Sequence, residues 1–137
     1  MKNFSMRGFS LVELLIAVVI VGILAVIAMP SYTNYMVRSS RTAAQTELLE
    51  LASVQEKIYL NSSAYTTSVT ADYNGTSAGG LGRASGQTND GKYDLAISGT
   101  AQTYTLTAAP VADGTQVSDG SISIRENGQR LWNGTAW

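Results

Sequence analysis

The sequence contains no cysteine and no histidine among its 137 residues. It therefore forms no disulfide and lacks thiolate nucleophiles, the usual zinc ligands and imidazole acid–base chemistry. Charge is also scarce, because only 14% of the residues are charged and the formal net charge is −1. The chain has no excess of basic residues, so its composition does not indicate nucleic acid as the principal partner. We find no catalytic constellation and expect a non-enzymatic protein without a cofactor or metal.

One long apolar run dominates the N-terminal part of the chain. It reads FSLVELLIAVVIVGILAVIAM from Phe9 to Met29, and Glu13 is its only ionisable residue. As a helix the run is roughly 31 Å long, which is one bilayer hydrocarbon thickness. A carboxylate deep in the bilayer costs about 2.5–3.5 kcal/mol. Glu13 therefore either has a partner or lies near enough to one end of the run to reach the headgroups.

The first eight residues, MKNFSMRG, resemble the positive region of an export signal, since they carry Lys2 and Arg7 and no acidic residue. An ordinary secretory signal is cut after its apolar run, but no small-residue cleavage site follows this run. A cut at the Gly8–Phe9 bond would instead leave the run on the mature chain. Glycine suits such a cut because its backbone is unhindered.

Residues 8–14, GFSLVEL, match the signature G-F-[ST]-L-[IV]-E-L. The sequence therefore resembles a type IV prepilin, and Gly22 and Pro30 stand where that family has an internal glycine and a helix-kinking proline. The resemblance implies cleavage after Gly8 by a prepilin peptidase and methylation of the Phe9 amine. It also implies a subunit pool in the bacterial inner membrane, a pilus assembly platform, and a homo- or hetero-oligomeric filament on the cell surface.

The resemblance also gives Glu13 a partner. After cleavage Phe9 would carry a positive amine at a helix N-terminus, and Glu13 lies one helical turn further on. The carboxylate could pair with its own amine or with that of a neighbouring subunit. Because an unpaired charge in an apolar core is strongly unfavourable, such a pair would set the register of assembly. We interpret Glu13 and Phe9 as assembly residues.

Helical character continues beyond Pro30, because residues 31–60 contain neither glycine nor proline. The continuous helix would run from Phe9 to Leu60, loosened at Gly22 and Pro30. An apolar stripe at helical spacing indicates a half-buried helix after residue 30. The stripe consists of Ala44, Leu48, Leu51 and Ile58, widened by Ala52 and Tyr59, whereas Arg38, Arg41, Glu47, Glu50, Glu56 and Lys57 fall mostly elsewhere.

A glycine-rich connection over 61–91 leads to strands, because apolar and polar residues alternate from Lys92 onward. We expect four antiparallel strands covered by the helix stripe, an α+β fold with the lollipop form of a type IV pilin. Asn127-Gly128 indicates a two-residue hairpin that pairs Ile124 with Leu131. Trp132 would then share the other face with Arg125 and Arg130. Opposed arginines are unfavourable, so either a stacked Trp132 or a longer turn must relieve them.

These patterns divide the chain into a leader (1–8), a transmembrane and filament-core half-helix (9–30), an amphipathic half-helix (31–60), a loop (61–91) and a sheet with the C-terminal region (92–137). Residues 31–137 would form the globular head. The head resembles the type IVa pilins of the PilE type. The residues that carry this likeness are Gln55–Tyr59, Asn61, Tyr65, Tyr104–Pro110, Gln116, Asp119, Gly128 and Trp137.

Those pilins usually fasten the C-terminal region with two cysteines, one just after the aspartate and one just before the final tryptophan. Here the two places read Asp119-Gly120-Ser121 and Thr135-Ala136-Trp137. The sequence leaves open how this region is held. We interpret Asp113 and Asp119 as turn residues rather than as calcium ligands.

The sequence alone leaves three possible functions. The first is a type IV pilus subunit for motility, adhesion or DNA uptake, and the alternative is a type II secretion pseudopilin, which shares the N-terminal signature. The third is a membrane-tethered binding domain that never polymerises. DNA would need a basic strip, for which the candidates are Arg83, Lys92, Arg125 and Arg130. We favour a solvated face for these four charges over DNA contact.

Overall fold

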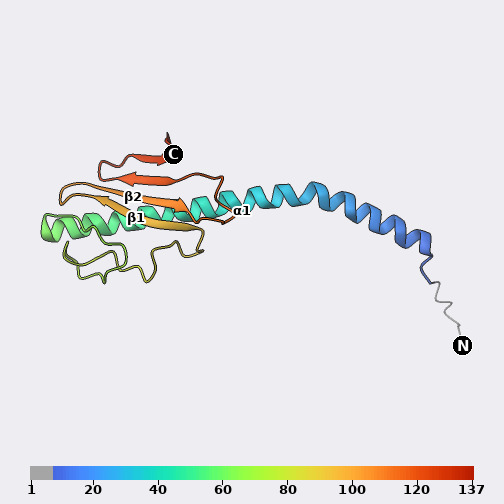
Figure 1. Ribbon diagram of the computed structural model, residues 1–137, viewed down its shortest axis with the longest axis horizontal. Coiled ribbons are helices and arrows are strands. Elements are labelled where there is room, and N and C mark those ends of the chain that lie inside the picture. Colours follow the sequence, from blue (N-terminus) through green and yellow to red (C-terminus); the bar gives the residue numbers. More distant parts are fainter. Residues whose placement is uncertain (1–7) are drawn as a thin grey trace, which may run out of the picture. The chain divides into compact units, whose positions relative to one another are not determined.

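The computed structural model describes residues 8–137 and divides into two compact units at Met36 and Val37 (Figure 1). We call residues 8–36 the apolar unit and Val37–Trp137 the head. Lys2 and Arg7 of the expected leader lie outside the described residues. The elements are α1 (Leu11–Ser62), β1 (Tyr93–Gly99), β2 (Tyr104–Pro110), β3 (Ile122–Arg125), β4 (Arg130–Trp132) and β5 (Thr135–Ala136).

The helix α1 starts two residues later than expected because Ser10 caps it. The Ser10 hydroxyl oxygen accepts a hydrogen bond from the Glu13 N–H at 3.3 Å, and its carbonyl accepts one from the Leu14 N–H at 3.1 Å. A serine followed by glutamate three residues later is the capping-box pattern, and an acidic first turn suits the helix dipole. Phe9 therefore lies before the helix and not in its first turn.

The predicted continuity of α1 is confirmed. The helix is 52 residues long and includes Pro30, and it ends at Ser62 instead of Leu60. Pro30 supplies no N–H to the helix, and the Thr33 hydroxyl donates to the Pro30 carbonyl at 2.9 Å. The next residue after the helix, Ser63, has a φ of 53°. Such a left-handed residue commonly follows the end of a helix.

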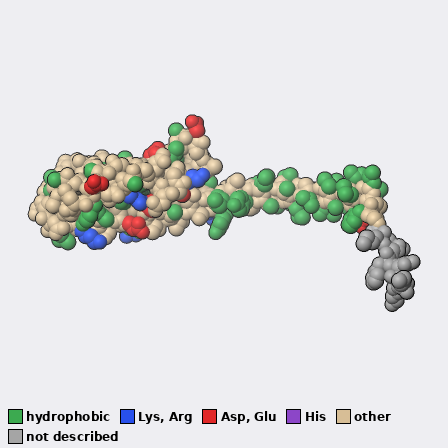
Figure 2. All heavy atoms as spheres, turned by 90° about the horizontal axis from the view of Figure 1, so that it is seen from below, with side chains coloured by type: hydrophobic (Ala, Val, Ile, Leu, Met, Phe, Trp, Pro, Cys, Tyr) green, Lys and Arg blue, Asp and Glu red, His purple; other side chains and the backbone are tan. Residues whose placement is uncertain are grey.

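The apolar unit exposes its large side chains. Phe9 is 76% exposed, Ile20 53% and Met29 72%. The most apolar window of α1 has a mean hydropathy of 3.1, and none of that window is buried. Figure 2 shows hydrophobic side chains along this part of the chain, whereas most of the visible charged side chains lie over the head. By length and composition, α1 is able to cross a membrane.

The sheet is antiparallel throughout, with the order β1-β2-β3-β4-β5. It therefore has one strand more than the four that the alternation predicted. The fifth strand arises because Asn133 and Gly134 adopt φ values of 48° and 81° in a two-residue turn. Positive φ at both positions is typical of a type I′ hairpin turn, which Asn-Gly favours.

The predicted register of the β3–β4 hairpin is wrong by one residue. Ile124 pairs with Arg130 and not with Leu131, and Ile122 pairs with Trp132. The reason is a three-residue turn, in which only Gly128 has a positive φ, at 79°. Its N–H donates to the Arg125 carbonyl at 2.9 Å. The longer turn brings Trp132 to the face of the sheet that carries the core.

The predicted helix stripe, apart from the half-buried Tyr59, forms the core with the inner face of the sheet. Leu48, Ile58, Leu106 and Ile122 are fully buried. Burial of such side chains contributes about 1.5–3 kcal/mol each, which is what binds the helix to the sheet. The whole set comprises Ala44, Leu48, Leu51, Ala52, Ile58, Val69, Leu81, Tyr93, Leu95, Tyr104, Leu106, Ala108, Ile122 and Ile124.

Two buried polar side chains of α1 fasten the long connection that follows the helix. Gln55 donates to the Thr66 carbonyl at 2.8 Å and accepts from the Thr66 N–H at 3.1 Å. Glu47, which the sequence placed off the stripe, is only 6% exposed, accepts the Asn89 N–H at 3.0 Å and pairs with Arg83. The loop is thus ordered by specific hydrogen bonds and not by regular structure.

Candidate functional sites

The first candidate site is the N-terminal end of the apolar unit. Gly8, Phe9 and Ser10 precede the helix and are exposed, and a Cβ added at Gly8 would meet no atom within 4 Å. Glu13 is exposed and forms no ion pair within residues 8–137. Gly22 likewise has open space around it. Among the described residues 8–137, therefore, no contact requires glycine at position 8.

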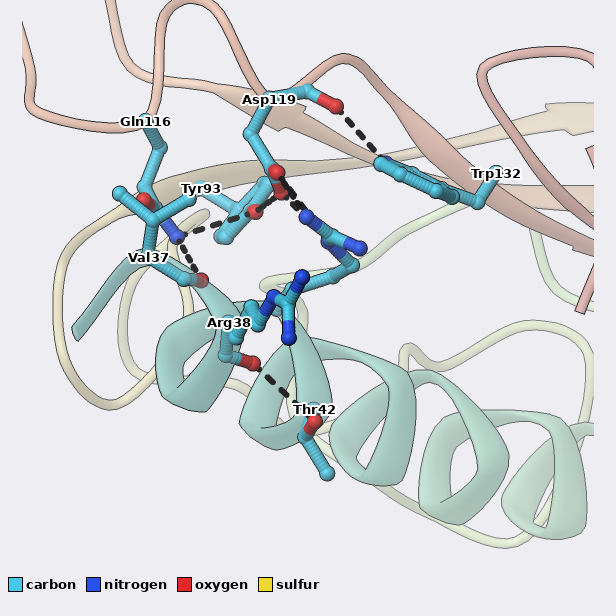
Figure 3. Close-up of polar contacts among 8 residues, drawn as sticks. Val37, Arg38, Thr42, Tyr93, Gln116, Asp119 and Trp132 are labelled. Carbon is cyan, nitrogen blue, oxygen red and sulfur yellow. Dashed lines mark hydrogen bonds and ion pairs between the residues drawn. The ribbon is translucent and has the colours of Figure 1, made fainter. Parts of the chain in front are cut away.

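The second site is a cluster that holds the C-terminal part of the head (Figure 3). Arg41 on α1 forms an ion pair with Asp119, and its Nε lies 2.9 Å from the carboxylate. The guanidinium carbon also lies 3.6 Å from the centre of the Trp132 ring on β4. Trp132 in turn donates its Nε1–H to the Asp119 carbonyl at 2.7 Å. We call Arg41, Asp119 and Trp132 the arginine clamp.

Buried groups complete the hydrogen bonding of the clamp. Tyr93 on β1 donates its hydroxyl to the Asp119 carboxylate at 2.7 Å. The Gln116 amide donates to the Tyr93 hydroxyl at 3.1 Å and to the Val37 carbonyl at 3.0 Å. Tyr93 and Gln116 are 0% and 1% exposed. The Asp119 carboxylate is also buried, and it needs these partners because an unpaired buried charge is costly.

The pKa values of Arg41 and Tyr93, which both contact Asp119, are raised. The hydrogen bond to Asp119 raises the pKa of Arg41, although partial burial opposes it. Burial raises the pKa of Tyr93 well above its ordinary value, and the hydrogen bond to Asp119 adds to this effect. Arg41 therefore stays charged and Tyr93 stays protonated at neutral pH.

The arginine clamp answers the question that the missing cysteines left open. It joins α1, the turn before β3 and strand β4 without a covalent bond. Sequence reasoning missed it, because Arg41 reads as a solvated charge and Asp119 as a turn residue. Asp119 does lie in a turn, but its carboxylate is buried. No local pattern links two residues that are 78 positions apart.

The four cations considered as candidates for a DNA strip do not lie in one strip. Arg83 is paired with Glu47. Lys92 lies next to Tyr93, which pairs with Pro110 at the end of β2. Arg125 pairs with Thr105, which lies five residues before Pro110 on the same strand. At about 3.3 Å per residue, this places Lys92 and Arg125 at opposite ends of the sheet. Arg125 and Arg130 lie together on the β3–β4 hairpin, at the end of β3 and the start of β4.

A tyrosine cluster closes the other end of the head. The rings of Tyr59 and Tyr65 stack at 4.6 Å, and Tyr104 meets Tyr65 edge-on at 4.7 Å. Tyr65 and Tyr104 both donate to Glu56, at 3.2 and 3.3 Å. Burial, followed by the charge of Glu56, raises the pKa of Tyr65 to about 12 and raises that of Tyr104 further. Both hydroxyls are held in the protonated form.

Comparison with known proteins agrees with this architecture. The family model described as "Type IV minor pilin ComP, DNA uptake sequence receptor" matches residues 30–122, well over half of the chain. The model described as "Prokaryotic N-terminal methylation motif" matches residues 3–29. A fimbrial protein of Neisseria meningitidis is 30% identical over 133 residues, which are 95% of this chain and 73% of the relative.

Two further relatives match over shorter stretches. The type IV major pilin protein PilA of Myxococcus xanthus is 41% identical over 59 residues, 43% of this chain. A fimbrial protein of Pseudomonas aeruginosa is 41% identical over 64 residues, 47% of this chain. The chain spans only 27% and 42% of the lengths of these two proteins.

The chain is therefore a type IV pilin and belongs to the family described as type IV minor pilin ComP, DNA uptake sequence receptor. The resemblance drawn from the N-terminal signature and the α+β fold class are both confirmed. Membership of a pilin family makes the protein a structural, non-enzymatic one.

We predict that Asp119→Asn lowers the free energy of unfolding of the head by about 3 kcal/mol, because it leaves the Arg41 cation without its ion pair. Denaturant unfolding of the full chain in detergent, followed by tryptophan fluorescence, measures this loss. Glu50→Gln is the control, since it removes an exposed carboxylate of α1 that forms no ion pair within the described residues. We expect it to stay within about 0.5 kcal/mol of wild type. Equal stabilities for the two variants would contradict a clamp.

We also predict that the head loses stability as the pH rises above about 10. Tyrosines in the unfolded chain ionise near that pH, whereas the folded pKa values of Tyr65, Tyr93 and Tyr104 are raised. The stabilisation is therefore complete below pH 10 and is lost as the pH rises through the folded values. Unfolding midpoints between pH 8 and 12 test this, and Tyr104→Phe should flatten the decline. Tyr73→Phe, outside the cluster, should keep the wild-type slope.

Proposed function

We propose that this chain is a subunit of a bacterial type IV pilus, held in the inner membrane and then polymerised into a filament through its N-terminal helix. The observation that carries the proposal is the apolar unit, in which every residue is exposed and which has a capped helix with a single carboxylate in its first turn. An apolar surface of this size on a folded chain needs lipid or other subunits to cover it. The family match favours a pilin over a secretion pseudopilin and over a tethered domain that never polymerises.

The proposal includes processing of the N-terminus. Residues 1–8 would be a leader, cut after Gly8 by a prepilin peptidase, and the amine of Phe9 would then be methylated. The exposed, non-helical backbone at Gly8–Ser10 supports this, because a peptidase needs an extended substrate outside a helix. The open space around Gly8 is consistent with a glycine that is required by the enzyme.

Glu13 would pair with the Phe9 amine of a neighbouring subunit. The sequence alone allowed Glu13 to pair either with the Phe9 amine of its own chain or with that of a neighbour. The Ser10 cap favours the pair between neighbouring subunits. Since Phe9 precedes the helix, its amine is not held in the helical register that places residues i and i+4 together. Gly22 and Pro30 would let the helix bend as subunits pack, because proline removes a backbone hydrogen bond.

Glu13→Ala should therefore leave membrane insertion intact and reduce filament assembly to near zero. Removing the carboxylate makes insertion easier by about 2.5–3.5 kcal/mol, but it leaves the neighbour's amine unpaired in an apolar core. The measurement is the ratio of sheared filament to membrane-held subunit, with Glu13→Asp expected to assemble partially. The intact mass of each variant serves as the control for a mature chain that starts at methylated Phe9. Wild-type filament yield from Glu13→Ala would overturn the assembly role.

A second proposal concerns the ligand, and we infer that the head binds double-stranded DNA. The family model that covers residues 30–122 is described as a DNA uptake sequence receptor. The head also carries Arg125 and Arg130, which are exposed and form no ion pair within residues 8–137. These two observations favour DNA as a ligand more strongly than the amino-acid composition alone does.

Fluorescence anisotropy of labelled duplex DNA, titrated with the full chain in detergent, tests the second proposal. We expect binding that weakens as salt rises, because phosphate contacts release counterions. Competition by unlabelled duplexes of unrelated sequence measures the specific part of the binding. Absence of any binding at low salt would remove DNA as a ligand, and the pilus proposal would stand without it.

A further inference from the structure

The β3–β4 hairpin ends in an exposed and ordered polar turn. The side chains of Asn127 and Gln129 are exposed, and the Gln129 N–H donates to the Asn127 side chain at 2.9 Å. Arg125 and Gln129 also share a backbone hydrogen bond of 3.0 Å. The turn is thus a fixed projection at the end of the sheet and presents amide groups to solvent.

The one acidic residue of the turn is directed back to the sheet. Glu126 accepts the Tyr104 N–H on its carboxylate at 3.3 Å and donates its own N–H to the Tyr104 carbonyl at 3.3 Å. The carboxylate keeps its charge, but the hydrogen bond holds it toward the backbone of β2. The outer surface of the turn is left with cationic and neutral polar side chains.

The two arginines lie on opposite faces of the hairpin. Arg125 follows the core residue Ile124 and so faces the solvent side of the sheet, opposite Thr105. Arg130 pairs with Ile124 and so lies on the other face. Successive residues of a strand alternate between faces, which makes this assignment independent of side-chain rotamers.

The side-chain contacts of these arginines leave their positive charges available. Arg125 donates to the neutral Gln129 side chain at 2.9 Å, and Arg130 lies 5.5 Å from the centre of the Trp137 ring. By contrast, the ion pairs with Asp119 and Glu47 occupy Arg41 and Arg83. The hairpin therefore concentrates the free guanidinium groups of the sheet in one place.

We propose that this turn is the DNA-contacting element of the head, entering a groove of duplex DNA with one arginine directed to each side. The inference rests on the proposal that the head binds DNA. The major groove is about 12 Å wide and admits a two-stranded ribbon. Arg125 and Arg130 would contact phosphates along its two edges, and the amides of Asn127 and Gln129 would face the bases. Duplex fits better than single-stranded DNA, because Arg130 lies over the Trp137 ring that a base would stack on.

The test compares two double variants with the same change in charge, in the full chain in detergent. Arg125→Gln with Arg130→Gln should weaken duplex binding by about ten- to hundredfold near 0.1 M salt and lower the salt slope by about two. Arg38→Gln with Lys57→Gln removes two exposed cations of α1, and we expect less than about a twofold effect. Tryptophan-monitored unfolding verifies that both variants remain folded.

The outcomes separate the two proposals. If the wild-type chain binds no duplex, the DNA proposal fails, and the hairpin proposal fails with it. If the wild type binds but both double variants bind equally, DNA binding stands and the hairpin proposal is overturned. Asn127→Ala with Gln129→Ala should reduce discrimination between sequences while leaving the salt slope unchanged. Tighter binding of single-stranded than of duplex DNA would also overturn the groove model.

Discussion

The buried carboxylate of Asp119 is the interaction on which the organisation of the head depends. It accepts hydrogen bonds from Arg41 on α1 and from Tyr93 on β1, while its backbone carbonyl accepts one from Trp132 on β4. A carboxylate with 7% exposure is tolerated only with such partners. The same requirement fixes the turn before β3 and the C-terminal hairpin, so a charge network holds this region without cysteines.

The two units of the chain differ in how they bury their apolar and charged side chains. The head buries a helix stripe against the inner face of its own sheet, and its few buried charges are paired. The apolar unit buries nothing within the described chain, and its one carboxylate has no ion pair there. A partner must therefore supply what the apolar unit lacks, either lipid or neighbouring subunits. The proposed assembly and membrane residence rest on this imbalance of burial.

The distribution of arginines links the fold to the proposed binding of DNA. Arg41 and Arg83 stabilise the head internally, through partners on distant parts of the chain. Arg125 and Arg130 are left at the exposed end of a hairpin. An acidic protein can therefore present a local cationic site, because pairing in the fold decides which charges remain available.

The sequence by itself determined the class of protein and most of α1, since the GFSLVEL signature, the apolar run and the stripe from Ala44 to Ile58 are local patterns. It also determined an antiparallel sheet, because alternation of period two reports a half-buried strand. The tertiary structure decided the register of β3–β4, where a three-residue turn replaced the two-residue turn that Asn127-Gly128 favours. It likewise decided the roles of Glu47, Arg41 and Asp119. Each of these charges depends on a partner far along the chain, which local periodicity does not encode.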